Sequence, residues 1–362
     1  MNESLTNRQI AFVIFGVIVG YGIMSLPKNI AENIGTGAWI VLIGATGIAV
    51  IFTYVFTYLA YIHKNKTLCE YSEILTGKFI SRLIVFIYTV EFFLFSSLVI
   101  RAASEVIKLN ILLKTPIWSI SLLFFIVIYY AVIKGLRVVG RICELYGFVI
   151  IIIMLFTHIL LFTQGELINL KPFILPLSIK TYIKASVTTV IPLLGIEVIA
   201  FIPFDKNNNK KVFKYGILMT IFIGFLYILV VESCISVMGV DTIINYHNAL
   251  LATIRRVDIE QLQFFRRLDG FVLLIWIMAV FTTATLFSYG TSFFASKCFN
   301  VEFKIITPIV IILSFIVSLI PKTTMEVRNI LDYIGYLAII NGGVIPLILL
   351  IITKVRRYDK KI

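Results

Sequence analysis

Apolar runs long enough to cross a lipid bilayer follow one another along almost the whole chain. A transmembrane helix needs about 20 mainly apolar residues, and about ten runs meet that requirement. The chain is 60% hydrophobic and 14% charged, whereas a soluble domain is nearly half apolar and roughly a quarter charged. Because a bilayer leaves no partner for free backbone groups, we expect an all-α polytopic membrane protein in which residues 1–362 form a single transmembrane domain. The runs extend approximately over 9–33, 37–62, 79–108, 116–134, 140–163, 182–204, 212–240, 269–298, 303–320 and 331–354.

The basic residues indicate how the chain is oriented in the bilayer. The formal net charge is +13, but Lys and Arg lie mostly between the apolar runs. If the N-terminus is cytoplasmic, 19 of the 32 Lys and Arg residues lie on the cytoplasmic side and 12 on the outer side, with Arg101 inside a span. This asymmetry follows the positive-inside rule and predicts that both termini are cytoplasmic. We therefore attribute the basic excess to topology and to contact with anionic membrane lipid, and expect no nucleic-acid partner.

Neither a cofactor nor a catalytic centre is indicated. The four cysteines and three histidines are scattered singly along the chain, which fits neither a disulfide framework nor a metal site. No catalytic motif with a known mechanism is present. We expect no cofactor, no metal and no enzymatic activity.

The first apolar run is interrupted by Gly20-Tyr21-Gly22-Ile23-Met24-Ser25-Leu26-Pro27. Such a break is tolerated at membrane depth only where it faces protein or a polar cavity. The two glycines allow the backbone to unwind and approach a ligand, and Pro27 restarts or kinks the helix. A half-helix that begins there directs free N–H groups and a positive dipole end toward the gap, which suits a carboxylate. The alternative is a simple kink, since Gly and Pro are common in membrane helices.

The sixth apolar run contains a second break, formed by Pro192, Gly195, Glu197 and Pro203. The broken runs are the first and sixth of ten, so they occupy corresponding positions in two five-span halves, approximately 9–163 and 182–354. This pattern is expected of an inverted-repeat carrier that binds its ligand near the midplane, between the broken helices. Glu197 would then contact a ligand ammonium group or a coupling proton. Alternatively, it braces the unwound segment by accepting backbone N–H groups.

Other polar residues within the spans are further candidates. Glu91 lies in the middle of the third span, with Tyr88 three residues before it on the same face. An ionised carboxylate at that depth costs at least ~2.5–3.5 kcal/mol, so Glu91 either faces the bundle interior with a partner or carries a proton. In the eighth span, the Thr283 hydroxyl can bond a ligand or a neighbouring helix. Apolar residues at helical spacing in 241–268 predict an amphipathic helix on the outer face.

Several segments together resemble the B subunits of bacterial spore germinant receptors. They are Arg8-Gln9, the Gly20–Pro27 break, Pro192 with Gly195-Ile196-Glu197-Val198, and the run from Leu250-Leu251-Ala252-Thr253-Ile254-Arg255-Arg256 through Arg266-Arg267-Leu268-Asp269-Gly270-Phe271 to Ile275-Trp276. The resemblance covers essentially the whole chain. It implies the amino acid–polyamine–organocation transporter superfamily, whose LeuT-like fold has ten helices, a five-plus-five inverted repeat and broken helices 1 and 6.

The resemblance also implies a function, partners and a site. The family senses a nutrient, often an amino acid, in the spore inner membrane, together with an A subunit and a lipoprotein C subunit. Gly20 and Gly22 match the glycines of the superfamily's Gly-Ser-Gly carboxylate motif, with Tyr21 in place of the serine. Ligand contacts in such proteins come from helices 1, 3, 6 and 8, which gives the following candidates: Gly20, Tyr21, Gly22, Tyr88, Glu91, Gly195, Glu197 and Thr283.

Two functions are consistent with these features. The first is a receptor subunit that binds a small nutrient between helices 1 and 6 and triggers spore germination. The second is a proton-coupled secondary amino acid transporter that uses the same site, with Glu91 or Glu197 as the titrating carboxylate.

Overall fold

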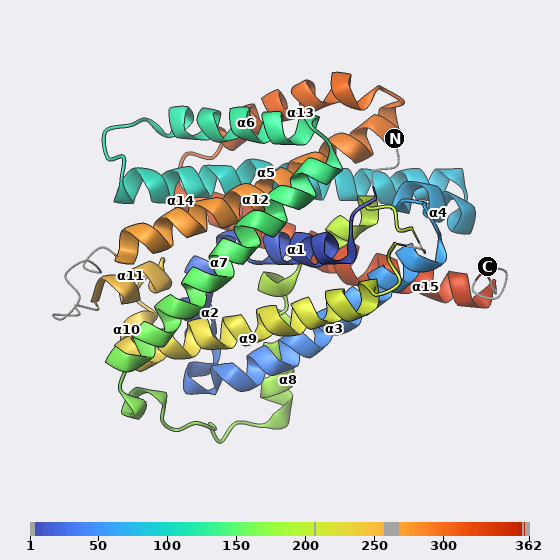
Figure 1. Ribbon diagram of the computed structural model, residues 1–362. Helices are drawn as coiled ribbons and strands as arrows, with labels where there is room; N and C mark the ends of the chain where they lie inside the picture. Colours follow the sequence, from blue (N-terminus) through green and yellow to red (C-terminus); the bar gives the residue numbers. More distant parts are fainter. Residues whose placement is uncertain (1–3, 206–207, 257–267, 357, 359–362) are drawn as a thin grey trace.

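The computed structural model describes residues 4–205, 208–256, 268–356 and 358. Within these ranges the ordered elements are all helices, and the long ones lie side by side in one bundle (Figure 1). In the described residues, six helical segments are long and apolar enough to cross a membrane, and the bent pair in the sixth predicted run makes a seventh. Three shorter apolar helices lie in the first, fourth and ninth runs, so each of the ten predicted runs is mainly helical. The first five spans are α1 (Asn7–Ile18) with α2 (Leu26–Ile34), α3 (Ala38–Ile62), α5 (Lys78–Asn110), α6 (Ile117–Ile133) and α7 (Leu136–Gln164). The second five are α8 (Ile179–Thr188) with the 3-10 turns η4 (Ile191–Leu193) and η5 (Ile196–Phe201), α9 (Val212–Met238), α12 (Leu268–Phe299), α13 (Phe303–Ser318), and α14 (Thr324–Ile339) with α15 (Ile345–Val355).

Both predicted breaks are present. Helix 1 to helix 10 denote the ten apolar runs in chain order, so helix 3 is α5, helix 6 is α8 with η4 and η5, helix 8 is α12, and helix 10 is α14 with α15. In helix 1, α1 has 12 residues, about 18 Å at 1.5 Å per residue, and therefore cannot cross a bilayer alone. A 3-10 turn, η1 (Tyr21–Met24), separates it from α2. In helix 6, α8 and the segment that follows it are bent by 46° relative to each other. The inner part of helix 6, predicted as helix up to residue 204, is a 3-10 segment that ends at Phe201.

The beginning of α1 and the end of α15 lie at the same end of the bundle, on the right in Figure 1. The Asn7 side chain donates a hydrogen bond to the carbonyl of Asn208 (3.0 Å). The Arg356 guanidinium donates to the carbonyl of Ile74 (3.5 Å), in the short helix α4 (Leu68–Thr76). This common end is consistent with an even number of spans.

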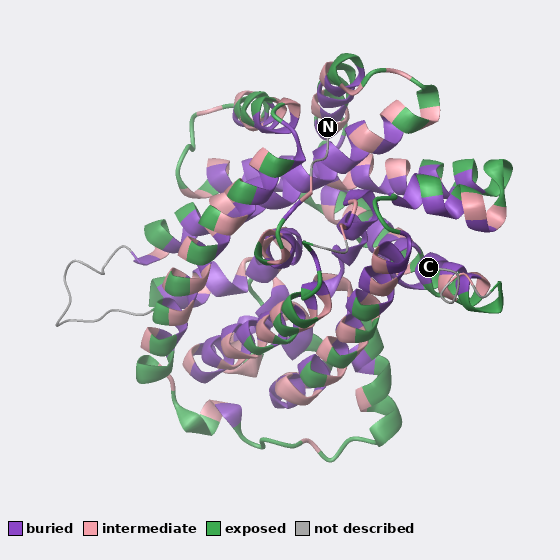
Figure 2. Ribbon diagram, turned by 45° about the vertical axis from the view of Figure 1, so that its right-hand side comes forward, coloured by how far each residue is buried: buried purple, intermediate pink, exposed green. Residues whose placement is uncertain are grey.

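The centre of the bundle is closely packed and mainly apolar. Figure 2 shows buried residues along the inner helices and exposed residues on the outward faces of the peripheral helices. Where α5 packs against α12, the ring of Phe287 lies 4.9 Å from Phe92 and 4.4 Å from Phe95 between centroids. Exposed apolar side chains on peripheral helices, such as Phe79 and Leu83 of α5, are suited to contact with lipid.

Within the predicted amphipathic segment 241–268 the structure has two short helices, α10 (Val240–Ile243) and α11 (Ala249–Arg256). In α11 the apolar Leu250, Leu251 and Ile254 are buried, while Arg255 and Arg256 are exposed, which is an amphipathic pattern; residues 257–267 lie outside the described part. One helix boundary needs correction. Helix 10 begins at Thr324 rather than at 331, because Thr323 accepts a hydrogen bond from the Glu326 N–H (3.2 Å) and caps a polar first turn.

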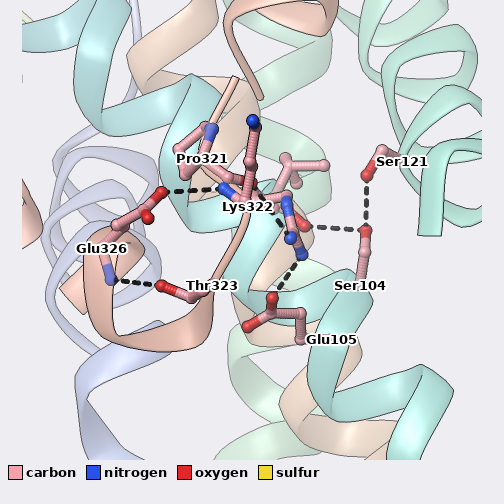
Figure 3. A network of polar contacts seen from close by, with 9 residues as sticks. Ser104, Glu105, Ser121, Pro321, Lys322, Thr323 and Glu326 are labelled. Atoms are coloured by element: carbon pink, nitrogen blue, oxygen red, sulfur yellow. Dashed lines mark hydrogen bonds and ion pairs between the residues drawn. The ribbon is translucent and has the colours of Figure 1, made fainter. Parts of the chain in front are cut away.

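The polar groups toward the C-terminal end of α5 form the network in Figure 3. The Arg101 guanidinium pairs with the Glu105 carboxylate, one turn along the same helix (2.6 Å), and donates to the carbonyl of Pro321 (3.2 Å). On the neighbouring turn, Ser104 accepts a hydrogen bond from Ser121 of α6 (2.9 Å). Both charges are almost fully buried, so the pair joins α5 to the segment that leads into α14 and is a structural element.

Candidate ligand site at the two helix breaks

The break in helix 1 packs directly against helix 8. Thr283 of α12 donates a hydrogen bond to the carbonyl of Gly16 (2.8 Å), one of the groups that the end of α1 leaves free. A Cβ on Gly20 would lie 2.2 Å from the Thr283 hydroxyl oxygen, so only glycine fits there. A Cβ on Gly22, in contrast, would have no other heavy atom within 4 Å. The first glycine therefore permits close packing, and the second faces open space.

The break in helix 6 requires a glycine for a different reason. Gly195 has a φ of 119°, in the left-handed region that favours glycine. Its N–H donates a hydrogen bond to the Glu197 carboxylate (3.0 Å). A Cβ on Gly195 would lie 3.1 Å from the side chain of Val17, which places this break beside helix 1.

One tyrosine joins the two breaks. The hydroxyl of Tyr227, in the middle of α9, lies 2.9 Å from the carbonyl oxygen of Ile18 and 3.3 Å from that of Pro192. Ile18 is the last residue of α1, and Pro192 precedes the Gly195 turn, so each carbonyl is at a broken helix. The fully buried Tyr227 thus holds the ends of helices 1 and 6 together in the interior.

A second polar cluster connects helices 3, 6 and 10. Asn341 donates a hydrogen bond from its side-chain amide to the Glu91 carboxylate, and its backbone carbonyl accepts one from the Tyr88 hydroxyl (2.6 Å). A further hydrogen bond joins the carboxyl groups of Glu91 and Glu197. All four side chains are at most 1% exposed. Asn341 lies in η7 (Ile340–Val344), a π turn that interrupts helix 10, and such turns occur frequently at functional sites.

The structure arranges the predicted site residues in three groups. Gly20 lies against Thr283 at the first break. Gly195, Glu197, Glu91 and Tyr88 belong to the connected region between helices 3, 6 and 10. Tyr21, by contrast, is only half-buried; the charged groups that act on its hydroxyl are Arg328, Glu105 and Asp332, so it lies apart from the carboxyl cluster, near α14. Gly22 follows Tyr21 in η1, and these two residues form the third group.

Sequence reasoning missed Tyr227 and Asn341. Tyr227 gave no signal, since one tyrosine in an apolar run looks like any packing residue. Asn341 did give a signal, because Asn341-Gly342-Gly343 stands in the middle of an otherwise apolar run, and an amide at membrane depth needs partners.

A polar contact joins α14 to α2, the half-helix that follows the first break. Arg328 of α14 lies 3.2 Å from Nδ1 of His247, just before α11, and 3.4 Å from the side-chain oxygen of Asn29 in α2. Desolvation and the positive charges of Lys28 and Arg328 lower the pKa of His247 below its usual 6.5. The neutral imidazole can accept a hydrogen bond from Arg328, whereas an imidazolium cannot.

A metal site does not emerge in the described ranges: no three His, Cys, Asp or Glu side chains there converge as metal ligands. The four cysteines are free thiols, three of them buried.

The fold defines a class of protein. It matches Mhp1, a nucleobase-cation-symport-1 family transporter whose structure is a closed conformation with bromovinylhydantoin bound, with a TM-score of 0.66 and 12% identity over 94% of this chain and 78% of that one. It also matches MhsT in complex with L-phenylalanine, with a TM-score of 0.65 and 13% identity over 98% of this chain and 89% of that one. The chain is a polytopic membrane protein with the LeuT-type transporter fold.

Sequence comparisons identify the family within that class. The family model for "Spore germination protein" matches residues 4–327. Spore germination protein A2 of Bacillus subtilis (strain 168) is 28% identical over 349 residues, which cover 95% of this chain and 94% of that protein. Spore germination protein GerLB of Bacillus cereus is 23% identical over 363 residues, which cover 98% of this chain and 96% of that protein. The chain therefore belongs to the spore germination protein family and is of the germinant receptor B-subunit type.

Proposed function

We propose that this protein is the nutrient-sensing subunit of a spore germinant receptor, and that it binds a small ligand of the amino acid type between the breaks of helices 1 and 6. The observation that carries the proposal is the meeting of the two breaks at Tyr227, which brings the unwound ends of both helices into one interior region. Unwound backbone at membrane depth is tolerated where it is buried in protein or lines a cavity, and in carriers with broken helices the ligand binds between the breaks. The fold neighbour MhsT, which was solved with L-phenylalanine, supports a ligand of this class.

The candidate residues form two sets, one suited to each charged group of a zwitterionic ligand. Gly22 and the N–H groups that precede α2 are suited to a carboxylate, because a helix begins there and open space adjoins Gly22. Glu197 and Glu91 are suited to an ammonium group, because they are carboxyl groups in the interior. Gly20 and Thr283 hold helices 1 and 8 at the spacing that the site requires.

Membership of the family supports a proposal for the assembly and location of the protein. We infer that the protein acts in the spore inner membrane, with both termini cytoplasmic, in a complex with an A subunit and a lipoprotein C subunit. Ligand binding would change the relation of the broken helices to the rest of the bundle, and the partners would convert this change into the germination signal.

Proton-coupled amino acid transport is the second candidate. The observation that favours it is the presence of two buried carboxyl groups, Glu91 and Glu197, joined by a hydrogen bond. Ionisable residues within spans are frequently parts of proton pathways. A transporter would release the ligand on the other side of the membrane, whereas a receptor subunit need not.

The deciding experiment measures binding and flux on the same preparation. The full chain is purified and reconstituted in liposomes, and a mixture of labelled amino acids is added with and without a proton gradient. The receptor proposal predicts saturable binding without net uptake. Uptake that is saturable and depends on the gradient would favour the transporter. Absence of binding and of flux, both for this chain and for the complex with its A and C subunits, would contradict both candidates.

A further inference from the structure

The cluster of Glu91, Glu197 and Asn341 has more hydrogen-bond acceptors than donors. Its donors are the Asn341 amide, the backbone N–H groups of Gly195 and Glu197, and the proton that a hydrogen bond between two carboxyl groups requires. The side-chain oxygen of Asn341 is buried and has no hydrogen-bond partner. A buried polar atom without a partner costs about 1–3 kcal/mol, so its retention needs an explanation.

The charge of the cluster also indicates that a positively charged group is missing. With one shared proton, the two carboxyl groups carry a net charge of −1. Within the described residues, no Lys, Arg or His forms an ion pair with either of them. The titratable groups that act on the cluster are the two carboxyl groups themselves, Tyr88 of α5 and, through Tyr88, Tyr71 of α4, and none of these supplies a positive charge. An unbalanced negative charge in the membrane interior is costly, and one monovalent cation would neutralise it.

The number and origin of the acceptors select the kind of cation. A primary ammonium group has three N–H donors. Three acceptors are available here, one on each of three helices: the Glu91 carboxyl, the Glu197 carboxyl and the Asn341 side-chain oxygen. The proton between the carboxyl groups can stay in place, so that ligand and site together are neutral.

Helix 10 contributes irregular backbone to this cluster. Asn341 lies in the π turn η7, where the regular helical hydrogen bonds are interrupted and the Tyr88 hydroxyl binds the Asn341 carbonyl instead. Gly342 follows, and a Cβ there would lie 3.3 Å from the Glu197 carboxylate oxygen. The absence of that Cβ lets the turn approach the carboxyl groups.

We propose that Glu91, Glu197 and Asn341 form an ammonium-binding subsite on helices 3, 6 and 10, in which the two carboxyl groups share one proton. This inference rests on the proposed function, because it assigns the ammonium end of the ligand, and it extends the site to helix 10. The ligand class is a primary amine, either an amino acid or a simple alkylammonium ion.

The test uses labelled methylammonium on the full chain in lipid nanodiscs. Because the pair carries a single negative charge, Glu91→Gln and Glu197→Gln should each keep methylammonium binding, while the double variant should lose roughly tenfold or more in affinity. Asn341→Leu, which removes the third acceptor, should weaken binding by a similar factor, and Asn341→Gln, which keeps an amide donor and acceptor, should retain more affinity than Asn341→Leu. Glu232→Gln removes a half-buried carboxyl from α9 and is the matched control.

The alternatives give different patterns. If each single Gln variant alone abolishes binding, the shared proton is wrong. If sodium or potassium ions compete with methylammonium at equal concentration, the site does not select ammonium. If L-alanine binds but methylammonium does not, and none of these variants changes L-alanine affinity, the subsite is wrong while the proposed function stands. If neither the amines nor the amino acid panel bind, the proposed function fails as well. Infrared difference spectra on intact, monodisperse samples add a second measurement: the band of a protonated carboxyl group should persist when methylammonium binds.

Discussion

Tyr227 offers the most direct test of the contact between the two breaks. In Tyr227→Phe the carbonyls of Ile18 and Pro192 lose their shared hydroxyl, and a buried acceptor left without a partner costs about 1–3 kcal/mol. We expect a lower melting temperature and weaker ligand binding. Tyr215→Phe, on an exposed part of the same helix, is the control and should change neither. Equal behaviour of the two variants would mean that the hydroxyl does not join the breaks.

The glycine pair of helix 1 allows a steric comparison within three residues. In Gly20→Ala the new methyl group would overlap the Thr283 hydroxyl, and such overpacking typically costs about 1–3 kcal/mol. Gly22→Ala should be tolerated for stability, because nothing lies near the new Cβ, but it narrows the open space and should reduce ligand affinity. Thermal unfolding and ligand titration measure the two effects. Partial recovery of stability by Thr283→Ala in the Gly20→Ala background would identify the contact responsible, and its absence would exclude it.

For single residues, the sequence predicted where the helix breaks lie better than which groups their side chains contact. The Gly20 and Gly195 breaks lie where their patterns placed them, because Gly and Pro act on the local backbone. The residues that Gly20 and Gly195 contact lie on helices far away in the sequence, at Thr283 and Val17. The local sequence pattern does not predict that packing. The Thr283 hydroxyl, left open between a ligand contact and a helix contact, bonds helix 1. Glu197 does brace its own turn; a ligand contact for it remains a prediction.

Among the elements, helices 6 and 10 depart most from what an apolar run suggests. Both runs were recognised as spans, but hydropathy does not distinguish an α-helix from a 3-10 segment or a π turn. The 3-10 segment of helix 6 and the π turn of helix 10 meet at Glu197 and Gly342. Irregular backbone therefore lies against irregular backbone, with carboxyl and amide groups between them. This arrangement follows from the need to satisfy free backbone groups inside a membrane protein, and it is visible only in three dimensions.

The contact between Arg328, His247 and Asn29 predicts a dependence on pH. The pKa of His247 is lowered in the folded protein, so the unfolded chain binds the proton first. The contribution of this group to stability is therefore present above about pH 6.5 and is lost as the pH falls below it. We expect the melting temperature of the wild type to fall more between pH 7.5 and 5.5 than that of His247→Gln. Parallel curves for the two proteins would show that His247 does not contribute.

For the whole molecule, the order of the apolar helical runs was predictable because a transmembrane helix needs about 20 mainly apolar residues. The orientation rests on a second regularity, the distribution of Lys and Arg, and it leads to a test at the two ends of α5. Lys66, before α4, and Lys114, after α5, are both exposed and lie at opposite ends of that helix. In a Cys298→Ser background, which leaves three buried cysteines, a membrane-impermeant maleimide should label Lys114→Cys in intact cells. Lys66→Cys should react only after permeabilisation. The reverse pattern would place the termini outside and turn the Arg328 contact toward the cytoplasm, so that the ligand would have to be sensed from within.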